Sequence, residues 1–234
     1  MPKLSPLIVA LDVETLRDVE KILQKLGPAV DFYKVGLKLF THYGPEVLKL
    51  LRRKRKRVFL DLKFHDIPNT AAEACREAVV HRVDMLTLHA SGGSEMMAAA
   101  VRATREESKK RKLPAPFLMG VTVLTSMDSL AELGLKTPPA RQVLRLAQLA
   151  AGAGMDGVIC SPQEIELLRA QLPRRFKIVT PGVRPAGADR GDQKRVKTPE
   201  EAFRLGADAI VMGRPILASP DPRALVTSIL RGRA

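Results

Sequence analysis

The sequence has few of the residues on which several classes of protein depend. Its 234 residues include only two cysteines and no tryptophan, and aromatic residues make up 4%. Two thiols in a chain of this length do not suggest the disulfide framework of a small secreted domain. No apolar run approaches the ~20 residues that cross a bilayer. The apolar run nearest the N-terminus, residues 7–11, ends at Asp12 and is too short for a signal-peptide core. We therefore expect a cytoplasmic protein with no membrane partner.

Groupings that hold metals or cofactors are also lacking. The four histidines and the two cysteines show no metal-ligand spacing. The segment after the first apolar run, residues 11–14, contains no glycine, so the dinucleotide-binding fingerprint is missing there. No serine or cysteine belongs to a recognisable pair of nucleophile and base. The sequence therefore predicts neither a metal nor a cofactor, and it gives no support to nucleophilic catalysis.

Positive charge is abundant, with a formal net charge of +14 that is concentrated partly in residues 52–57 and 109–112. Such clusters are typical of nucleic-acid-binding surfaces. They are also typical of solvated helix ends, where cations suit the negative end of the helix dipole. Because aromatic residues are scarce, no stacking platform for bases accompanies the charge. We favour helix ends and expect no nucleic-acid partner; a basic nucleic-acid-binding protein remains the more distant alternative.

Short β-branched runs alternate along the chain with longer amphipathic stretches. The predicted strands are residues 7–11, 32–35, 58–62, 85–89, 117–121, 157–160, 177–180 and 209–212. The predicted helices are residues 16–26, 46–51, 71–81, 94–111, 141–151, 164–171, 200–205 and 223–230. Eight such units predict an α/β protein, a single (β/α)8 TIM barrel that spans residues 1–234 as one domain. A doubly wound open sheet is the alternative, which a count of strands does not exclude.

The third predicted strand carries the most informative polar residues. In an α/β barrel the chemistry lies at the C-terminal ends of the strands. Asp61 and Lys63 are two residues apart, so a strand directs both side chains to the same face. Lys34 near the end of the second strand and Asp66 in the loop after the third extend this charged cluster. Buried ion pairs are poor stabilisers, so we favour a functional site over a structural ion pair.

The loops after the seventh and eighth predicted strands have the features of a phosphate site, which such barrels commonly place there. Gly182 and Gly213 allow backbone amides to approach an anion closely. Arg184 and Arg214 provide guanidinium groups that match phosphate oxygens, and Gln193 offers an amide donor. A plain strand-to-helix turn would explain one of these loops but explains both together less well. The pattern predicts a phosphorylated substrate.

These residues resemble a known family. Residues 61–67, Asp-Leu-Lys-Phe-His-Asp-Ile, are similar to the Asp-x-Lys-x-x-Asp-Ile motif of orotidine 5'-phosphate decarboxylases. The resemblance covers nearly the whole chain, and its other segments follow in the family's order: residues 10–12, 33–36, 121–126, 180–185, 191–195 and 211–216. It implies a TIM barrel that converts orotidine 5'-monophosphate to uridine 5'-monophosphate (UMP) and CO2 without a cofactor, the last step of de novo UMP synthesis.

The resemblance also implies roles for individual residues. Lys63 would donate the proton to C6 of the pyrimidine, and Asp61 would lie beside the substrate carboxylate. Asp66, with Ile67 and Thr70, would reach across a homodimer interface into the partner's site. The other substrate-binding residues that it implies are Asp12 and Lys34 for the ribose, Thr125 near the pyrimidine, and Arg184, Gln193, Gly213 and Arg214 for the phosphate.

The closest rival is a magnesium-dependent sugar-phosphate decarboxylase or aldolase of the same suprafamily. Those enzymes share the Asp-x-Lys-x-x-Asp strand and the phosphate loops, and they hold Mg²⁺ partly through a carboxylate on the second strand. The corresponding position here is Lys34, and a cation is a poor neighbour for an ion that prefers oxygen ligands. We therefore favour the metal-independent decarboxylase.

Overall fold

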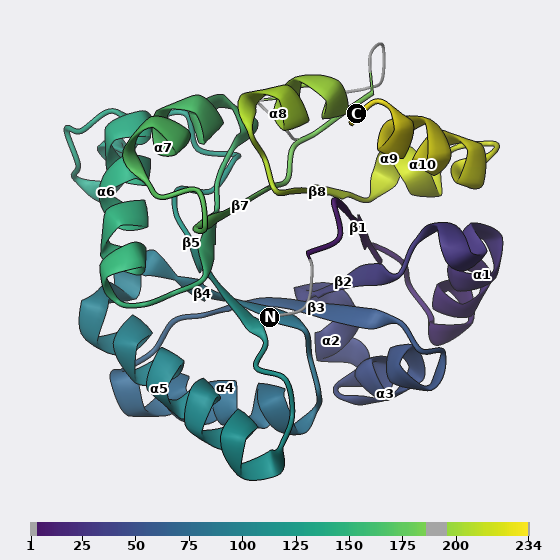
Figure 1. Cartoon of the computed structure of the whole chain (residues 1–234), viewed down its shortest axis with the longest axis horizontal. Coiled ribbons are helices and arrows are strands. Elements are labelled where there is room, and N and C mark those ends of the chain that lie inside the picture. Colours follow the sequence, from purple (N-terminus) through teal and green to yellow (C-terminus); the bar gives the residue numbers. More distant parts are fainter. Residues whose placement is uncertain (1–3, 186–195, 234) are drawn as a thin grey trace.

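The computed structural model describes residues 4–185 and 196–233, whose strands form a closed barrel surrounded by helices (Figure 1). The strands are β1 (Leu7–Ala10), β2 (Phe32–Gly36), β3 (Arg57–Phe64), β4 (Met85–His89), β5 (Phe117–Val121), β6 (Gly157–Ile159), β7 (Lys177–Thr180) and β8 (Ala209–Met212). Each strand pairs in parallel with its neighbours in sequence, and β1 also pairs with β8. The predicted TIM barrel is thereby confirmed, and the open sheet is excluded.

Helices cover the outside of the barrel. They are α1 (Leu16–Leu26), α2 (Leu37–Tyr43), α3 (Glu46–Arg53), α4 (Pro68–Val80), α5 (Gly93–Arg111), α6 (Pro139–Gly152), α7 (Ile165–Gln171), α8 (Pro199–Leu205), α9 (Arg214–Leu217) and α10 (Pro222–Arg231). Short 3-10 turns occupy Gly27–Ala29, Ala90–Gly92, Ala131–Leu133 and Pro162–Glu164. The sequence did not predict α2 and α9: α9 has only four residues, about one turn, which is too short to show the 3.6-residue period, and α2 begins directly after β2 with no loop between them.

The strands separate two apolar layers by simple alternation. Residues such as Ile8, Phe59 and Met119 point into the barrel and pack there against one another. Their sequence neighbours, among them Val9 and Leu60, point outward and pack beneath the helices. This period of two follows from strand geometry. It also fixes which side chains reach the barrel mouth, because an inward position at the end of a strand must face the opening.

Several helices begin with side-chain caps at the end of the barrel where the strands finish. Thr15 accepts a hydrogen bond from the Asp18 N–H at the start of α1, at 3.1 Å. Thr198 and Glu201 form a reciprocal capping box at the start of α8. Asp221 accepts from the Ala224 N–H at the start of α10. Each cap satisfies an amide that the helix itself leaves without a partner.

The opposite ends of the helices carry the basic clusters. Arg52 and Arg53 close α3, and residues 109–111 close α5, so both clusters lie at helix C-termini. Arg55, Arg82 and Lys112 follow α3, α4 and α5 with left-handed backbones, at φ of 55°, 56° and 55°. This conformation costs a non-glycine residue roughly 1–2 kcal/mol, and glycine usually occupies it.

No helix in the described part of the chain has both the length and the apolar character that crossing a bilayer requires.

Candidate active site

A cavity of about 260 Å³ lies at the C-terminal ends of the strands. Its floor is the upper end of the barrel interior, where Ala10, Phe59 and Val211 present apolar side chains. Its polar lining contains eight residues that the sequence predicted: Asp12, Lys34, Asp61, Lys63, Thr125, Arg184, Gly213 and Arg214. The cavity therefore has an apolar base beneath a mouth with charges of both signs.

Asp61 on β3 is the centre of the charged cluster. Its Oδ1 accepts a hydrogen bond from Lys63 Nζ at 2.9 Å, and its Oδ2 lies 3.4 Å from Lys34 Nζ on β2. The Asp61 side chain is only 13% exposed, and those of Lys34 and Lys63 are 15% and 28% exposed. One carboxylate thus fixes two ammonium groups that face the cavity.

The environment of Asp61 favours its ionised form. Burial on its own would raise the pKa of this carboxyl group. The opposing effects of Lys34 and Lys63, together with hydrogen bonds from Lys63 and Thr87, outweigh that burial and lower the pKa below its usual value. The carboxylate is therefore charged throughout the physiological pH range, and the cluster is an array of two cations around one anion.

Thr87 on β4 belongs to this cluster, although the sequence analysis did not single it out. Its hydroxyl donates to Asp61 Oδ1 at 3.0 Å and accepts from the backbone N–H of Lys63 at 3.0 Å. Thr87 is 1% exposed. The signal in the sequence was a polar residue in the otherwise apolar run 85–88, two positions after the inward-facing Met85.

The backbone of β3 is irregular where it carries Lys63. The pairing of β3 with β4 shifts register between Leu60 and Phe64, and Lys63 has a left-handed φ of 53°. Despite this irregularity, Asp61 and Lys63 both line the cavity, as strand alternation predicted. Backbone strain at a non-glycine residue persists only where its surroundings enforce it, and it is concentrated at functional sites. The hydrogen bond from the Lys63 N–H to Thr87 is one such constraint.

Two glycines leave space for polar side chains of the cavity. A Cβ atom on Gly213 would lie 2.8 Å from Asp12 Oδ2, and one on Gly36 would lie 3.2 Å from Lys34 Nζ. A side chain at Gly213 would displace the Asp12 carboxylate, which is exposed just after β1. The absence of a side chain at these positions thus helps to place Asp12 and Lys34.

The proposed phosphate side is made by the loops after β7 and β8. Gly182 has a φ of 75°, a conformation that other residues adopt at a cost. Arg214 is exposed at the start of α9 and lines the cavity. Arg184 also lines the cavity but is only 8% exposed, and its Nη1 donates to the Val183 carbonyl at 3.0 Å. Gln193 lies outside the described residues.

The wall opposite the charged cluster is mainly apolar. Thr125 is half-buried in the loop after β5. The apolar lining residues nearby in sequence or on the next strand are Val121, Val123, Leu124 and Ile159, with Cys160 beside them. This combination suits a flat, partly apolar ring between the charged cluster and the phosphate side.

Three residues that the sequence predicted lie outside this cavity. Asp66, Ile67 and Thr70 are exposed, and Ile67 is 67% exposed. Asp66 Oδ1 accepts a hydrogen bond from the Ile67 N–H at 2.7 Å. The structure therefore brings together Lys34, Asp61 and Lys63, and it leaves Asp66 out of the site of its own chain.

Within residues 4–185 and 196–233, no three His, Cys, Asp or Glu side chains form a group that could hold a metal ion. The arrangement can instead hold an anionic group near Arg214 and place a second group of the same ligand beside the ammonium of Lys63. Such a site stabilises negative charge that develops near Lys63 by electrostatic preorganisation.

Comparison with known proteins identifies the relatives of this chain. Residues 5–229 match the model of the "Orotidine 5'-phosphate decarboxylase / HUMPS family". An orotidine 5'-phosphate decarboxylase of Moorella thermoacetica is 51% identical over 226 residues, which cover 95% of this chain and 90% of that protein. One of Vibrio parahaemolyticus is 47% identical over 224 residues, covering 95% and 94% of the two chains.

Solved structures show the same similarity. The crystal structure of orotidine 5'-phosphate decarboxylase from Lactobacillus acidophilus superposes with a TM-score of 0.85 at 39% sequence identity, covering 97% of this chain and 98% of that chain. An uncharacterized conserved protein from Geobacillus kaustophilus superposes with a TM-score of 0.86 at 32% identity, covering 98% and 100% of the two chains.

Proposed function

The chain belongs to the orotidine 5'-phosphate decarboxylase / HUMPS family, and from this premise we propose how its cavity acts on orotidine 5'-monophosphate. The protein is an orotidine 5'-phosphate decarboxylase, which forms UMP and CO2 in pyrimidine biosynthesis. The observation that carries the proposed mechanism is the array in which Asp61 holds the ammonium groups of Lys34 and Lys63 at the cavity wall.

Lys63 is the proton donor in this proposal. The bond between C6 and the carboxylate carbon breaks, CO2 leaves, and the electron pair stays at C6 in an sp2 orbital that the ring does not delocalise well. The Lys63 ammonium stabilises that pair and then transfers a proton to C6. Lys63 is left as a neutral amine and regains its proton from solvent. Preorganised charge of this kind is commonly the largest single term in catalysis.

Asp61 orients Lys63 and lies beside the substrate carboxylate. The hydrogen bond of 2.9 Å from Lys63 Nζ to Asp61 Oδ1 and the constraint from Thr87 support a fixed position for the ammonium. The lowered pKa of Asp61 supports a charged carboxylate at this place. A fixed anion also repels the substrate carboxylate, and that repulsion ends when CO2 leaves.

The remaining lining residues hold the rest of the substrate. In this proposal Asp12 and Lys34 bind the ribose hydroxyls, and Thr125 lies near the pyrimidine. Arg214, Gly213, Arg184 and Gln193 hold the phosphate. Contacts to the phosphate are remote from C6, but they stabilise the substrate in the reactive position, and so they contribute to the rate.

A homodimer with two shared sites accounts best for the exposed residues after β3. Ile67, in the loop after β3, is 67% exposed, and Leu37, which follows the neighbouring strand β2, is 56% exposed. Exposed apolar patches are typical of interaction surfaces, and Asp66 and Thr70, close to Ile67 in sequence, are also exposed. We propose that a second copy covers this region and that Asp66, Ile67 and Thr70 enter the partner's cavity.

Mixing two inactive variants tests the shared site. Lys63→Ala and Asp66→Asn should each be inactive alone. In a mixed dimer one site carries both substitutions and the other carries neither, so activity should return after subunit exchange. Exchange is verified by a mass tag on one variant. If proven exchange restores nothing, Asp66 acts within its own chain.

The assay that tests the function follows the loss of orotidine monophosphate absorbance in the presence of a chelator. Full activity is expected, because Lys34 stands where the magnesium-dependent enzymes of the suprafamily have a carboxylate. Activity that returns only with added Mg²⁺ would favour the sugar-phosphate enzyme.

The family match over residues 5–229 supports one catalytic domain across residues 1–234. The two cysteines, Cys75 and Cys160, are both buried and unbridged, which is consistent with a reducing cytoplasm.

A further inference from the structure

The net positive charge of the chain lies at one end of the barrel. We define the N-terminal face as a set of segments at the end of the barrel where the strands begin. Each segment runs from the last three residues of an outer helix to the first residue of the next strand, and the last segment is the end of α10 with the two residues that follow it. They are residues 24–32, 51–57, 78–85, 109–117, 150–157, 169–177, 203–209 and 229–233. These segments contain nineteen lysines and arginines but only four aspartates and glutamates. The rest of the chain contains twenty lysines and arginines and twenty-one aspartates and glutamates.

The carboxylates of this face are occupied by the barrel itself. Asp84, Asp156 and Asp208 accept hydrogen bonds from the backbone N–H groups of neighbouring strands, each at 2.8 Å. Asp31 accepts from the Ser5 hydroxyl at 2.7 Å. Three of the four also form ion pairs, but only with Arg52, Arg57, Arg169 and Lys177, so four carboxylates leave most of the nineteen cations without one of them as a partner.

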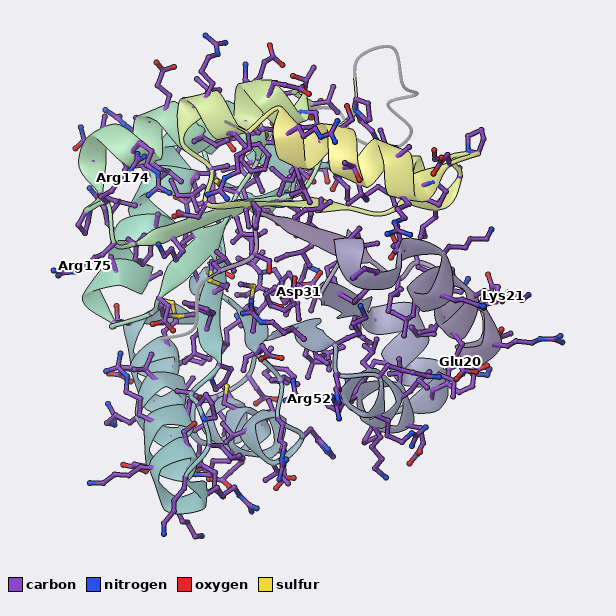
Figure 2. All side chains as sticks on the ribbon, turned by 45° about the vertical axis from the view of Figure 1, so that its right-hand side comes forward. Glu20, Lys21, Asp31, Arg52, Arg174 and Arg175 are labelled. Carbon is purple, nitrogen blue, oxygen red and sulfur yellow. The ribbon has the colours of Figure 1, made fainter. Side chains whose placement is uncertain are left out.

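Most of the cations on the face are therefore available to a partner. Within the described residues, eleven of the nineteen are exposed and have no carboxylate within 4.0 Å, among them Arg53, Lys109, Arg174 and Arg175. Figure 2 shows Arg174 and Arg175 extending outward from the edge of the molecule, well apart from Arg52 on the same face. The charge is spread over the end of the barrel, not gathered in one spot.

Helix dipoles do not account for this distribution. A dipole favours cations at every helix C-terminus, yet the end of α6, residues 150–157, has no cation and contains Asp156. After α3, α4 and α5, Arg55, Arg82 and Lys112 take a left-handed backbone in which a glycine would be unstrained. Gly27, Gly154 and Gly206 are found at comparable places after α1, α6 and α8. Three cations thus stand at positions where the backbone conformation favours glycine.

We infer that the N-terminal face of the barrel binds the phosphate backbone of a nucleic acid, without reading its base sequence. Guanidinium and ammonium groups pair with phosphates. Of the phenylalanines of this face, Phe32, Phe117 and Phe176 are buried, and Phe203 is half-buried with the Arg233 guanidinium 5.8 Å from its ring centroid, so the described part of the face offers no open platform on which bases stack. The sequence suggested only separate solvated helix ends; the barrel topology brings those ends onto one surface.

A membrane surface fits the face less well. Of the six large exposed apolar side chains among the described residues, five lie elsewhere and follow the C-terminal ends of strands, on the active-site side of the barrel: Leu37, Ile67, Leu124, Leu133 and Leu135. The sixth, Leu149 on α6, borders the N-terminal face as a single side chain. The proposed nucleic-acid surface and the catalytic cavity are therefore at opposite ends of the molecule, and both can be occupied together.

The test measures fluorescence anisotropy of a short labelled RNA strand and of a DNA duplex over roughly 50–300 mM salt. The test variant replaces Arg55, Arg82 and Lys112 by asparagine, which tolerates the left-handed backbone. The matched control replaces Arg17, Arg141 and Arg145 by glutamine. These three are exposed cations without an ion pair among the described residues, and they lie off the N-terminal face.

Binding should weaken as salt rises. Each lost phosphate contact lowers the salt slope by roughly 0.7–0.9, so the triple asparagine variant should lose about two units of slope and bind at least about tenfold more weakly. The control should bind like the parent, both variants should keep the parent's thermal midpoint, and saturating UMP should not displace the nucleic acid.

Four outcomes would overturn the inference: no binding at the lowest salt, equal losses in both variants, displacement by UMP, or preferential binding to phosphatidylglycerol vesicles. The test does not depend on the decarboxylase assignment. Lys63→Ala should still bind nucleic acid, and the asparagine variant should still decarboxylate.

Discussion

Both ends of the barrel contain a carboxylate held between cations, and the two arrangements differ in what else the carboxylate binds. At the N-terminal face, Asp208 contacts Lys177 at 3.1 Å, pairs with Arg169, and accepts the Ile178 N–H at 2.8 Å. At the C-terminal face, Asp61 contacts two lysines and the Thr87 hydroxyl. The carboxylate of Asp208 is bound to the backbone of a strand, whereas the partners of Asp61 within residues 4–185 and 196–233 are side chains at a cavity.

The difference shows how a structural ion pair is distinguished from a functional one. Asp84 repeats the pattern of Asp208, because it accepts the Val58 N–H and pairs with Arg52 at 2.9 Å. Removing such a carboxylate breaks the link between neighbouring strands. Removing Asp61 should leave the strands linked and disturb only the groups that face the substrate. Ion pairing by itself therefore predicts little, and the other partners of the carboxylate decide its role.

The largest expected effect is that of Lys63→Ala, which should lower turnover at least about a thousandfold, or ~4 kcal/mol in barrier, with the fold intact. Lys63 is proposed to balance the charge at C6 and to deliver the proton, and truncation removes both functions. The matched control is Lys177→Ala at the opposite face, which should keep turnover near that of the parent. Turnover is measured on purified, folded dimer. Activity within about tenfold of the parent, ~1.4 kcal/mol, would remove Lys63 from the role of proton donor.

A smaller effect is expected from Arg214→Ala. The loss of a charge-assisted hydrogen bond costs roughly 1.5–3 kcal/mol, so inhibition by UMP should weaken by about 10- to 150-fold. Uridine has no phosphate, so its weak inhibition should not change. Arg174→Ala, on the N-terminal face, is the control and should bind UMP like the parent. Equal losses for UMP and uridine would show that Arg214 does not serve the phosphate.

The free energy of unfolding should depend more on the carboxylate of Asp208 than on that of Asp61, the reverse of their importance for turnover. Asp208→Asn should lower the free energy of unfolding by about 2–3 kcal/mol, because Arg169, whose side chain is 9% exposed, loses its ionic partner. Turnover per folded enzyme should be retained. Asp61→Asn should abolish turnover but lower the free energy of unfolding by less than Asp208→Asn does, because Lys34 and Lys63 open onto the cavity and Asp61 holds no backbone N–H of a neighbouring strand among the described residues. Urea titrations measure both, and a larger loss for Asp61→Asn would reverse the comparison.

The smallest effect concerns pH. Burial raises the pKa of Asp156 above its usual value, and the Leu118 N–H and nearby Arg105 offset only part of that effect. The folded chain then binds more protons than the unfolded chain just above pH 3.8, so stability falls as pH rises through the folded pKa. Asp156→Asn should remove this loss of stability. The free energy of unfolding of the variant, compared with that of the parent, should therefore be higher at pH 7 than at pH 4. Asp61 has the opposite shift and keeps its charge to lower pH.

Much of the fold could be predicted from the sequence because local signals and global structure agree. All eight predicted strands exist, with β3 longer at both ends than expected. The errors are the two short helices α2 and α9, which follow Gly36 and Gly213. Their length is set by the need to connect strand ends, which no local period reveals.

The site could be predicted in its main residues but not in its geometry. Asp61 and Lys63 were identified through strand alternation, and that argument holds across the irregular part of β3. Thr87 was missed, because its hydroxyl matters only when the register shift brings it opposite Lys63. Nothing in the spacing of residues predicts that shift.

The sequence by itself determined the eight strands, every helix except α2 and α9, and which strand side chains face inward, because alternation and helical period are local properties of the chain. Closure of the barrel decided the rest. It brought Lys34 to 3.4 Å from Asp61 across neighbouring strands. It also placed the C-terminal ends of the outer helices on one face, so that scattered basic clusters became one charged surface. Both results depend on contacts between segments far apart in sequence, and only the packing of the complete barrel fixes such contacts.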